Sequence, residues 1–338
     1  MMSSPKKRSV PQHFLLSSKA KSLSLKEVAR LSEDEAYAMF IGLRYADNEG
    51  KPCCPYCGES TAIYTYQARR IFKCKVCTKQ FSPTAGTPFA HRKMSMVDIL
   101  LGIVIFVNGV KGHGALHLSR ELTCNYRTAF VLAHKLREAL GRLQGQHKFT
   151  GIVEIDGLWA GGKIKPANLV KNRIDLRTVD HPKRRSVVTI RERRAGGRCR
   201  SFVFKHESDA IPIILATVHE KAKIRVDEGK HWNVLWEYFD DVKSVNHDKE
   251  GYVVNGVHTN WVESFNSRVR RAEIGIHHHI AGPHLQHYAD EMAWREDHRR
   301  VSNGAQFTLL LSTLARGPSS RRWKGYWQRG PSFQKRRA

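Results

Sequence analysis

The feature that most constrains this chain is a pair of matched cysteine motifs near its N-terminus. Cys54-Pro-Tyr-Cys57 is followed after sixteen residues by Cys74-Lys-Val-Cys77. Each motif forms a tight turn whose two thiolates point at one metal ion, and two such turns complete a tetrahedral sulfur site. The spacing predicts a zinc ribbon in which these four cysteines bind a structural Zn²⁺ ion.

The residues around the motifs support this interpretation. Residues 63–66 and 70–72 are rich in aromatic and β-branched side chains, and they predict the two strands of the ribbon. Gly58, directly after the first motif, permits the turn that the backbone needs there. Cys53 is not expected to be a ligand. A redox pair or a chance cluster is the alternative, and the match between the two motifs disfavours it. The seven cysteines, an odd number, also argue against a disulfide framework.

The charge of the chain indicates its partner. Lys and Arg total 57 against 31 Asp and Glu, a formal net charge of +26, and an excess of this size favours a polyanion such as nucleic acid. The longest apolar run, 99–107, is far shorter than the roughly 18 residues of a membrane span. We therefore expect a cytosolic protein with no membrane partner. Gly161-Gly162-Lys163 lacks the spacing of a phosphate-binding loop, so no nucleotide is expected.

Residues 114–122 and 125–134 have the spacing of a helix-turn-helix. Apolar residues of the first helix are expected to pack on those of the second, namely Ala115, Leu118 and Leu122 on Ala129, Leu132 and Ala133. The second helix would then present outward-facing residues to a major groove, namely Tyr126, Arg127 and His134. An ordinary helical hairpin fits the pattern nearly as well when the surrounding charge is disregarded.

Three acidic residues stand out against the basic second half of the chain. Asp156 comes near the end of an apolar strand, Asp227 ends a second strand, and Glu263 lies early in a helix, with 35 residues between it and Asp227. Two strand-borne aspartates and a helix-borne glutamate are what a ribonuclease-H-like sheet uses to bind two divalent metal ions, and Mg²⁺ prefers such oxygen ligands. Glu154, on the same strand face as Asp156, and Glu228, beside Asp227, remain alternatives.

These motifs together resemble a known family. The sequence is similar to bacterial insertion-sequence transposases of the DDE class with an N-terminal zinc ribbon, in the insertion-sequence family numbered fifteen ninety-five with an ISXO-type transposase domain. The similarity rests on blocks between about residues 35 and 300: CPYCG at 54–58, FKCKVCTKQFSPTAGTPF at 72–89, VEIDGLWAGG at 153–162, VDEG at 226–229, VNGVHTNWVESFNSRVRR at 254–271 and HHHIAGPHLQHYADEMAWR at 277–295.

The resemblance implies which residues act. Asp156, Asp227 and Glu263 would be the catalytic residues and would bind two Mg²⁺ or Mn²⁺ ions, and Arg270 would contact the DNA end where the family usually has Lys. His258 and Asn260 are second candidates for the third catalytic position, because some members are reported with His or Asn there. Gly157 and Asn266 depart from the family, which often has an acid and an aromatic residue at these places.

The resemblance also implies the function. The protein would be a DNA transposase that cuts double-stranded DNA at the inverted repeats of an insertion sequence and joins the 3′ ends to target DNA. A homo-oligomer in the synaptic complex and a location in the bacterial cytoplasm, nucleoid-associated when DNA is bound, are expected. Two rivals remain: a catalytically inactive zinc-ribbon and helix-turn-helix DNA-binding protein, and a structure-specific DNA nuclease on the same fold.

The predicted fold class is α+β, with an N-terminal zinc ribbon, a helix-turn-helix segment and a ribonuclease-H-like α/β catalytic domain. The expected boundaries are a basic flexible N-terminus at 1–31, a helix plus zinc ribbon at 32–90, a helix-turn-helix DNA-binding segment at 91–145, a DDE transposase domain at 146–302 and a basic C-terminal tail at 303–338. Ser32 and Glu35 predict a capping box, the apolar residues 95–107 predict a buried helix, and residues 186–204 predict a hairpin. The tail aromatics Trp323, Tyr326 and Trp327 would either stack on unpaired bases or pack on the core.

Overall fold

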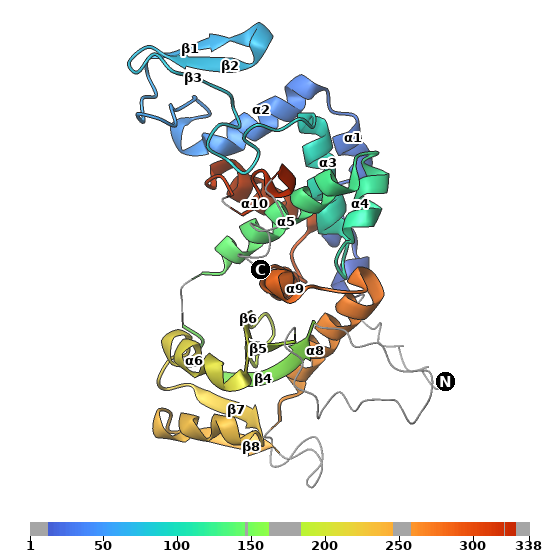
Figure 1. Ribbon diagram of the computed structural model, residues 1–338, viewed down its shortest axis with the longest axis vertical. Coiled ribbons are helices and arrows are strands. Elements are labelled where there is room, and N and C mark those ends of the chain that lie inside the picture. The colour runs from blue at the N-terminus through green and yellow to red at the C-terminus, as the bar shows by residue number, and fades with distance from the viewer. Residues whose placement is uncertain (1–12, 146–147, 162–183, 246–257, 321, 329–338) are drawn as a thin grey trace, which may run out of the picture.

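Three parts follow one another along the long axis of the molecule (Figure 1). A small three-stranded ribbon lies at one end, a five-stranded sheet with its helices lies at the other, and a group of helices lies between them. The computed structural model describes residues 13–145, 148–161, 184–245, 258–320 and 322–328. Gly162 and Lys163, the first four residues of the block at 254–271 and the end of the basic tail therefore lie outside the described residues.

The ribbon consists of β1 (Ile63–Tyr66), β2 (Ile71–Cys74) and β3 (Gln80–Phe81), paired antiparallel in that order. The two predicted strands are confirmed, and a short third strand follows the second cysteine motif. The core of the ribbon is small, with Phe72 and Phe81 packed at a ring distance of 5.4 Å beside Cys54 and Cys74. A fold of this size ordinarily needs a metal ion or a disulfide for stability.

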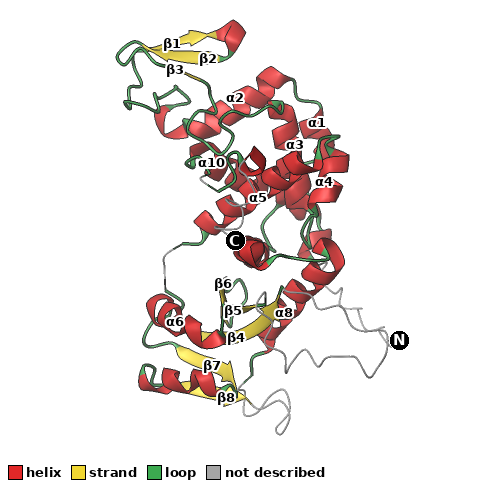
Figure 2. Ribbon diagram, viewed as in Figure 1, coloured by secondary structure: helices red, strands yellow, loops and turns green. Residues whose placement is uncertain are grey.

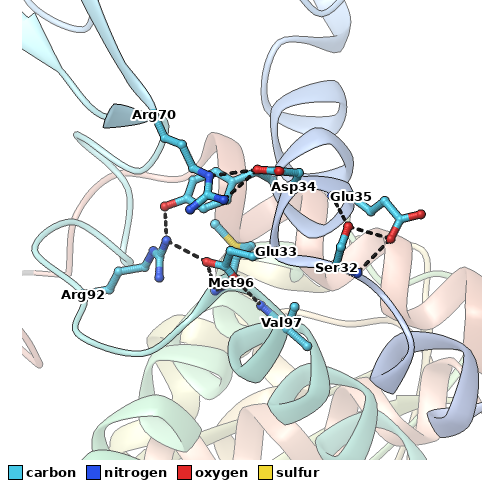
Figure 3. A network of polar contacts seen from close by, with 9 residues as sticks. Ser32, Glu33, Asp34, Glu35, Arg70, Arg92, Met96 and Val97 are labelled. Carbon is cyan, nitrogen blue, oxygen red and sulfur yellow. Dashed lines mark hydrogen bonds and ion pairs between the residues drawn. The ribbon is translucent and has the colours of Figure 1, made fainter. Parts of the chain in front are cut away.

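The acidic start of helix α2 (Glu33–Arg44) connects the ribbon to the helices (Figure 3). Ser32 and Glu35 form the predicted capping box. Asp34 pairs with Arg70 of the ribbon at 2.7 Å between Oδ1 and Nη2. The carboxylate of Glu33 accepts the backbone N–H of Met96 at 2.8 Å, at the start of the next long helix. Three consecutive acids thus stabilise three different contacts.

The helices of the middle part come from both ends of the chain. They share one hydrophobic core and comprise α1 (Leu25–Ala29), α2, α3 (Met96–Asn108), α4 (Ala115–Glu121), α5 (Tyr126–Leu143) and α10 (Asn303–Arg316). The apolar run predicted to be buried is α3, and almost all of it is buried. The expected boundaries are wrong at both ends, because Val28 of α1 and Leu310 and Leu314 of α10 belong to this core. Residues 303–316 are a core helix, and the predicted tail begins only after it.

The second folded part contains a five-stranded mixed sheet (Figure 2). Its strands are β4 (Ile152–Ala160), β5 (Arg185–Glu192), β6 (Cys199–Phe204), β7 (Lys223–Asp227) and β8 (Val242–Val245). Their order is β6-β5-β4-β7-β8, where β5 is antiparallel to β4 and β6, and β4, β7 and β8 are parallel. This topology is consistent with the predicted ribonuclease-H-like fold, and β5–β6 is the predicted hairpin.

The two faces of the sheet pack against different helices. On one face, Val153 and Ile155 pack toward α6 (Ile211–Thr217). On the other face, Leu158 and Ala160 pack toward α8 (Asn260–Ala272) and α9 (Leu285–Asp297). Short 3-10 and π segments complete the described structure: η1 (Phe14–Leu16), η2 (Ser18–Ala20), η3 (Ala46–Asn48), η4 (Gln67–Arg69), η6 (Glu207–Ala210), η7 (Lys230–Glu237), η8 (Glu273–His277), η9 (Gly282–His284) and η10 (Tyr326–Gln328).

Helix α9 joins the sheet to the helical part, since it packs against both β6 and α5. At its centre, Glu291 receives the guanidinium of Arg137 from α5 at 2.6 Å and that of Arg295 at 2.8 Å. Arg295 also donates to the carbonyl of Phe106 at the end of α3. Because Arg137 and Glu291 are both 1% exposed, removing Glu291 would leave the buried charge of Arg137 uncompensated.

Candidate active site and zinc ribbon

Strand pairing brings the two predicted aspartates to the same level on neighbouring strands. Strands β4 and β7 run parallel, with Ile152 opposite Lys223 and Glu154 opposite Arg225. The same offset continued along the strands sets Asp156 opposite Asp227, which is the last residue of β7. Carboxyl ends of adjacent parallel strands are where α/β sheets place their ligand sites.

Helix α8 carries the third acid to the same face of β4. Asn266, one turn after Glu263, donates from Nδ2 to Oδ2 of Asp156 at 2.8 Å. The oxygen of the Asn266 amide accepts the hydroxyl of the buried Thr189 on β5 at 3.2 Å. Thr259 donates its hydroxyl to the carboxylate of Glu263. Asn266, which departs from the family pattern, thus connects the helix of one acid to the strand of another.

Glu154 was considered above as an alternative metal ligand. In the structure its carboxylate contacts the start of helix α8 instead. Its Oε2 accepts the backbone N–H groups of Trp261 and Val262, both at 2.9 Å, in the first turn of α8. Its Oε1 pairs with Arg193 at 2.7 Å. The N-cap residue Thr259 makes no side-chain cap, so a carboxylate from the sheet satisfies the start of the helix instead. Glu154 therefore positions the helix that carries Glu263.

We expect Glu154→Gln to lower the free energy of unfolding by about 3 kcal/mol, because it removes a fully buried charge that pairs with Arg193 and accepts two backbone N–H groups of α8. Urea unfolding of the full chain measures this. Glu220→Gln, which changes an exposed glutamate, is the matched control and should stay within about 0.5 kcal/mol of the parent. A loss of under about 1 kcal/mol in Glu154→Gln would contradict the capping role.

The electrostatics of Asp156 reflect the nearby acids. Burial, followed by the charge of Asp227, raises the pKa of Asp156 to about 7, while the hydrogen bond from Asn266 lowers it. Glu263 and Glu207 contribute smaller increases. A divalent cation would relieve this repulsion, and the donors are all carboxylate oxygens, so the residues present fit Mg²⁺ or Mn²⁺.

The carboxylate oxygens of the three acids do not form one compact cluster. Among the described residues, two groups of three or more possible ligand atoms lie within 4.8 Å of one another, and neither contains Asp156, Asp227 or Glu263. Metal ions in a two-metal site lie about 3.5–4 Å apart, so ligands of one ion need not approach those of the other this closely.

Sequence reasoning missed Glu207, which η6 brings to the edge of the site. A side chain at Gly157 would collide with the carboxylate of Glu207, so the glycine that departs from the family pattern makes room for this acid. Glu207 pairs with His231 at 3.1 Å and accepts the hydroxyl of Ser186 at 3.3 Å. No local pattern marks Glu207, because 50 residues separate it from Gly157 along the chain.

The four predicted zinc ligands converge in the ribbon. The Sγ atoms of Cys54 and Cys77 lie 3.6 Å apart, as do those of Cys57 and Cys74, and all four lie within 4.8 Å of one another. Tetrahedral Zn–S bonds of about 2.3 Å give S···S distances near 3.8 Å, so the four thiolates fit one zinc ion. Cys53 lies outside the cluster, with its Sγ 3.2 Å from the carbonyl of Gly58.

Comparison with known families gives a match for the zinc ribbon and another for the domain that contains the acidic site. Residues 31–80 match the transposase zinc-ribbon domain, and residues 148–297 match the ISXO2-like transposase domain. The chain carries a transposase zinc ribbon and an ISXO2-like transposase domain. Within the transposase domain, the match runs from just before β4 to the end of α9. Curated proteins and solved structures give no significant match.

The transposase family implies DNA binding, and two of the predicted DNA contacts are exposed at the start of α5. Tyr126 and Arg127 form its first turn after the cap residue Asn125. Arg270 is exposed on α8, two turns after Glu263 and therefore on the same helix face. None of the helices that the structure describes combines the length and apolarity needed to cross a membrane.

The prediction that His134 faces outward is wrong. His134 is fully buried, and its ring stacks on Trp323 at 4.1 Å. The segment after α10 brings Trp323, Tyr326 and Trp327 back onto α5, where all three rings lie within about 6 Å of Phe130. The tail aromatics therefore pack on the core, and most of the proposed recognition helix is covered by this segment and by α9.

Proposed function

We propose that this protein cuts DNA at the ends of an insertion sequence and joins the 3′ ends to target DNA, with Asp156, Asp227 and Glu263 as its catalytic residues. The single observation that most supports this is the register of β4 and β7, which sets Asp156 level with Asp227 beside the helix that carries Glu263. Half-buried acids on adjacent parallel strands and the neighbouring helix would form a site for divalent cations, which matches the chemistry of the family.

The reaction consists of two in-line displacements at phosphorus. Water attacks the phosphodiester at the element end and releases a 3′-hydroxyl, and this hydroxyl then attacks a phosphodiester of the target. When bound, two Mg²⁺ or Mn²⁺ ions would activate the attacking oxygen and stabilise the leaving oxygen. The chain's own residues bind and orient: the carboxylates of Asp156 and Asp227 would hold the ions, and Asn266 fixes the first carboxylate by its hydrogen bond.

Exposed basic side chains would bind the DNA, apart from the acids that would bind the metal ions. Arg270 would contact the phosphates of the DNA end, since it lies on the α8 face that carries Glu263. A second basic region is the groove between the start of α5 and the C-terminal segment, which is lined by cationic residues, namely Arg92, Lys93, Arg127, Lys135 and Lys324. We infer that duplex DNA lies along this groove, because its charge suits phosphates and its aromatic wall includes Trp327.

Arg127→Ala should weaken binding to the element end by roughly 5- to 150-fold, the effect of losing a bidentate base contact, and leave binding to random duplex nearly unchanged. Fluorescence anisotropy over a salt series, on specific and random duplexes, measures both. Arg30→Ala removes one exposed charge outside the groove and is the matched control. Equal weakening on both duplexes would make Arg127 a phosphate contact and remove the support for α5 as the recognition helix.

A non-catalytic DNA-binding protein and a structure-specific nuclease remain the rivals. Cleavage and joining assays on the element's own ends, with branched DNA as the competing substrate, separate the three. Activity on specific ends supports the transposase, activity on branched DNA supports the nuclease, and binding without cleavage in either metal supports the DNA-binding protein.

A further inference from the structure

A second cluster of metal-ligating side chains lies at the start of the predicted helix-turn-helix, away from both the ribbon and the acidic site. His113 lies two residues before α4, and His117 and Glu121 follow at intervals of four residues. Residues four apart on a helix lie on the same face, one turn above the other. The spacing therefore places His117 and Glu121 on one side of α4, and His113 reaches the same carboxylate from the loop before the helix.

The two histidines approach the same carboxylate from the same direction. Nε2 of His113 lies 2.8 Å from Oε2 of Glu121, and Nε2 of His117 lies 3.5 Å from its Oε1. The two imidazole rings stack with centroids 4.6 Å apart at an interplanar angle of 22°. One ligand atom from each residue lies within 4.8 Å of the others, so a single ion can contact all three.

One side of the cluster is buried in the protein, and the other side is open to solvent. His113 is buried, and its backbone carbonyl accepts a hydrogen bond from Arg137 at 3.2 Å, which ties it to the buried pair of Arg137 and Glu291. The side chain of His117 is 67% exposed, whereas that of Glu121 is 35% exposed. A buried, anchored ligand beside two accessible ones gives a metal ion both a defined position and a path of entry.

A simple ion pair explains only part of this arrangement. One histidine paired with Glu121 would satisfy that carboxylate, and the exposed second ring would gain little from stacking beside the first. Two imidazole nitrogens and one carboxylate are instead the ligand set of zinc sites with three protein ligands, which keep a fourth position for water or another ligand. Imidazole also suits zinc, copper, iron and nickel better than the hard ions Mg²⁺ and Ca²⁺.

We propose that His113, His117 and Glu121 bind a second zinc ion, with solvent in its fourth position. The ion would cross-link the loop before α4 to the last turn of that helix. Helix α4 has seven residues, too few to be stable alone, so such a cross-link stabilises the corner between α4 and α5. The proposal is independent of the catalytic assignment, because none of its ligands belongs to the acidic site.

The test is the zinc content of the full chain after equilibration with Zn²⁺ and removal of free metal. The parent protein should bind two zinc ions, and both His117→Ala and Glu121→Gln should bind one. His117 is exposed, so its replacement leaves the fold intact. His278→Ala, which removes an exposed histidine outside the cluster, is the matched control and should keep two.

Co²⁺ substitution identifies which site each variant has lost. The ribbon gives intense thiolate-to-cobalt absorption, and this band should persist in His117→Ala while the weaker absorption of the second site disappears. One zinc in the parent protein, or two in His117→Ala, would overturn the proposal. A second zinc that persists in His117→Ala but disappears in Asp156→Asn would locate it in the acidic site and would overturn it equally.

Discussion

Asp156→Asn should reduce DNA strand cleavage and joining by at least about three orders of magnitude, while DNA binding stays within a few fold of the parent protein. The amide keeps the shape of the carboxylate and an oxygen that can accept from Nδ2 of Asn266, so the local fold is retained. It removes one negative charge from a half-buried position opposite Asp227. Metal affinity and rate should therefore fall together, and Asp227→Asn and Glu263→Gln should behave alike.

The assay uses a labelled element end with Mg²⁺, with Mn²⁺ and with chelator. Asp240→Asn makes the same chemical change at an exposed position outside the acidic site and should retain activity. Near-normal strand transfer by Glu263→Gln would show that the third ligand is misassigned, and His258 or Asn260 would become the candidate. If the parent protein is inactive on its own ends with either metal, the hypothesis of a non-catalytic DNA-binding protein is favoured over the transposase.

The second large effect concerns the ribbon. Replacing Cys74 and Cys77 together by serine should remove one zinc ion per chain and unfold the ribbon. Structural zinc binding contributes on the order of 10 kcal/mol to small domains of this kind, far more than the packing of Phe72 on Phe81 can replace. The helical core should survive, because the apolar contacts of α3 with α10 lie outside the ribbon.

Elemental analysis gives the zinc loss, and limited proteolysis between residues 53 and 81 reports unfolding of the ribbon. Cys53→Ser is the matched control, since Cys53 lies outside the sulfur cluster, and it should keep its zinc and its resistance to protease. Zinc retained in the double variant would contradict the ligand assignment. Loss of the main thermal transition would contradict the independence of the helical core.

Features that depend on neighbours in the sequence were predictable. The cysteine motifs are confirmed as a four-sulfur cluster, because each turn needs only its own four residues. The capping box at Ser32 and Glu35 and the hairpin of β5 and β6 are confirmed for the same reason. The strands that carry Asp156 and Asp227 were also readable, since both are short apolar runs that contain an acid.

The errors came where one helix has several possible partners. The pattern of α5 shows an apolar face, yet His134 on its other side is covered by Trp323, which lies 189 residues later. Helix α10 was assigned to the tail, although its leucines complete the core of α3. An amphipathic pattern states that a face must be buried but not what buries it.

The sequence by itself determined the ligands of the ribbon and the strands and helix that carry the acids, because turn geometry and periodicity are local. Only the tertiary structure decided the rest. The register of β4 and β7 sets Asp156 opposite Asp227 across 70 intervening residues, and Glu154 caps a helix that begins more than 100 residues later. These contacts depend on which strands and helices meet when the apolar faces are buried. Short-range sequence patterns do not specify these partners.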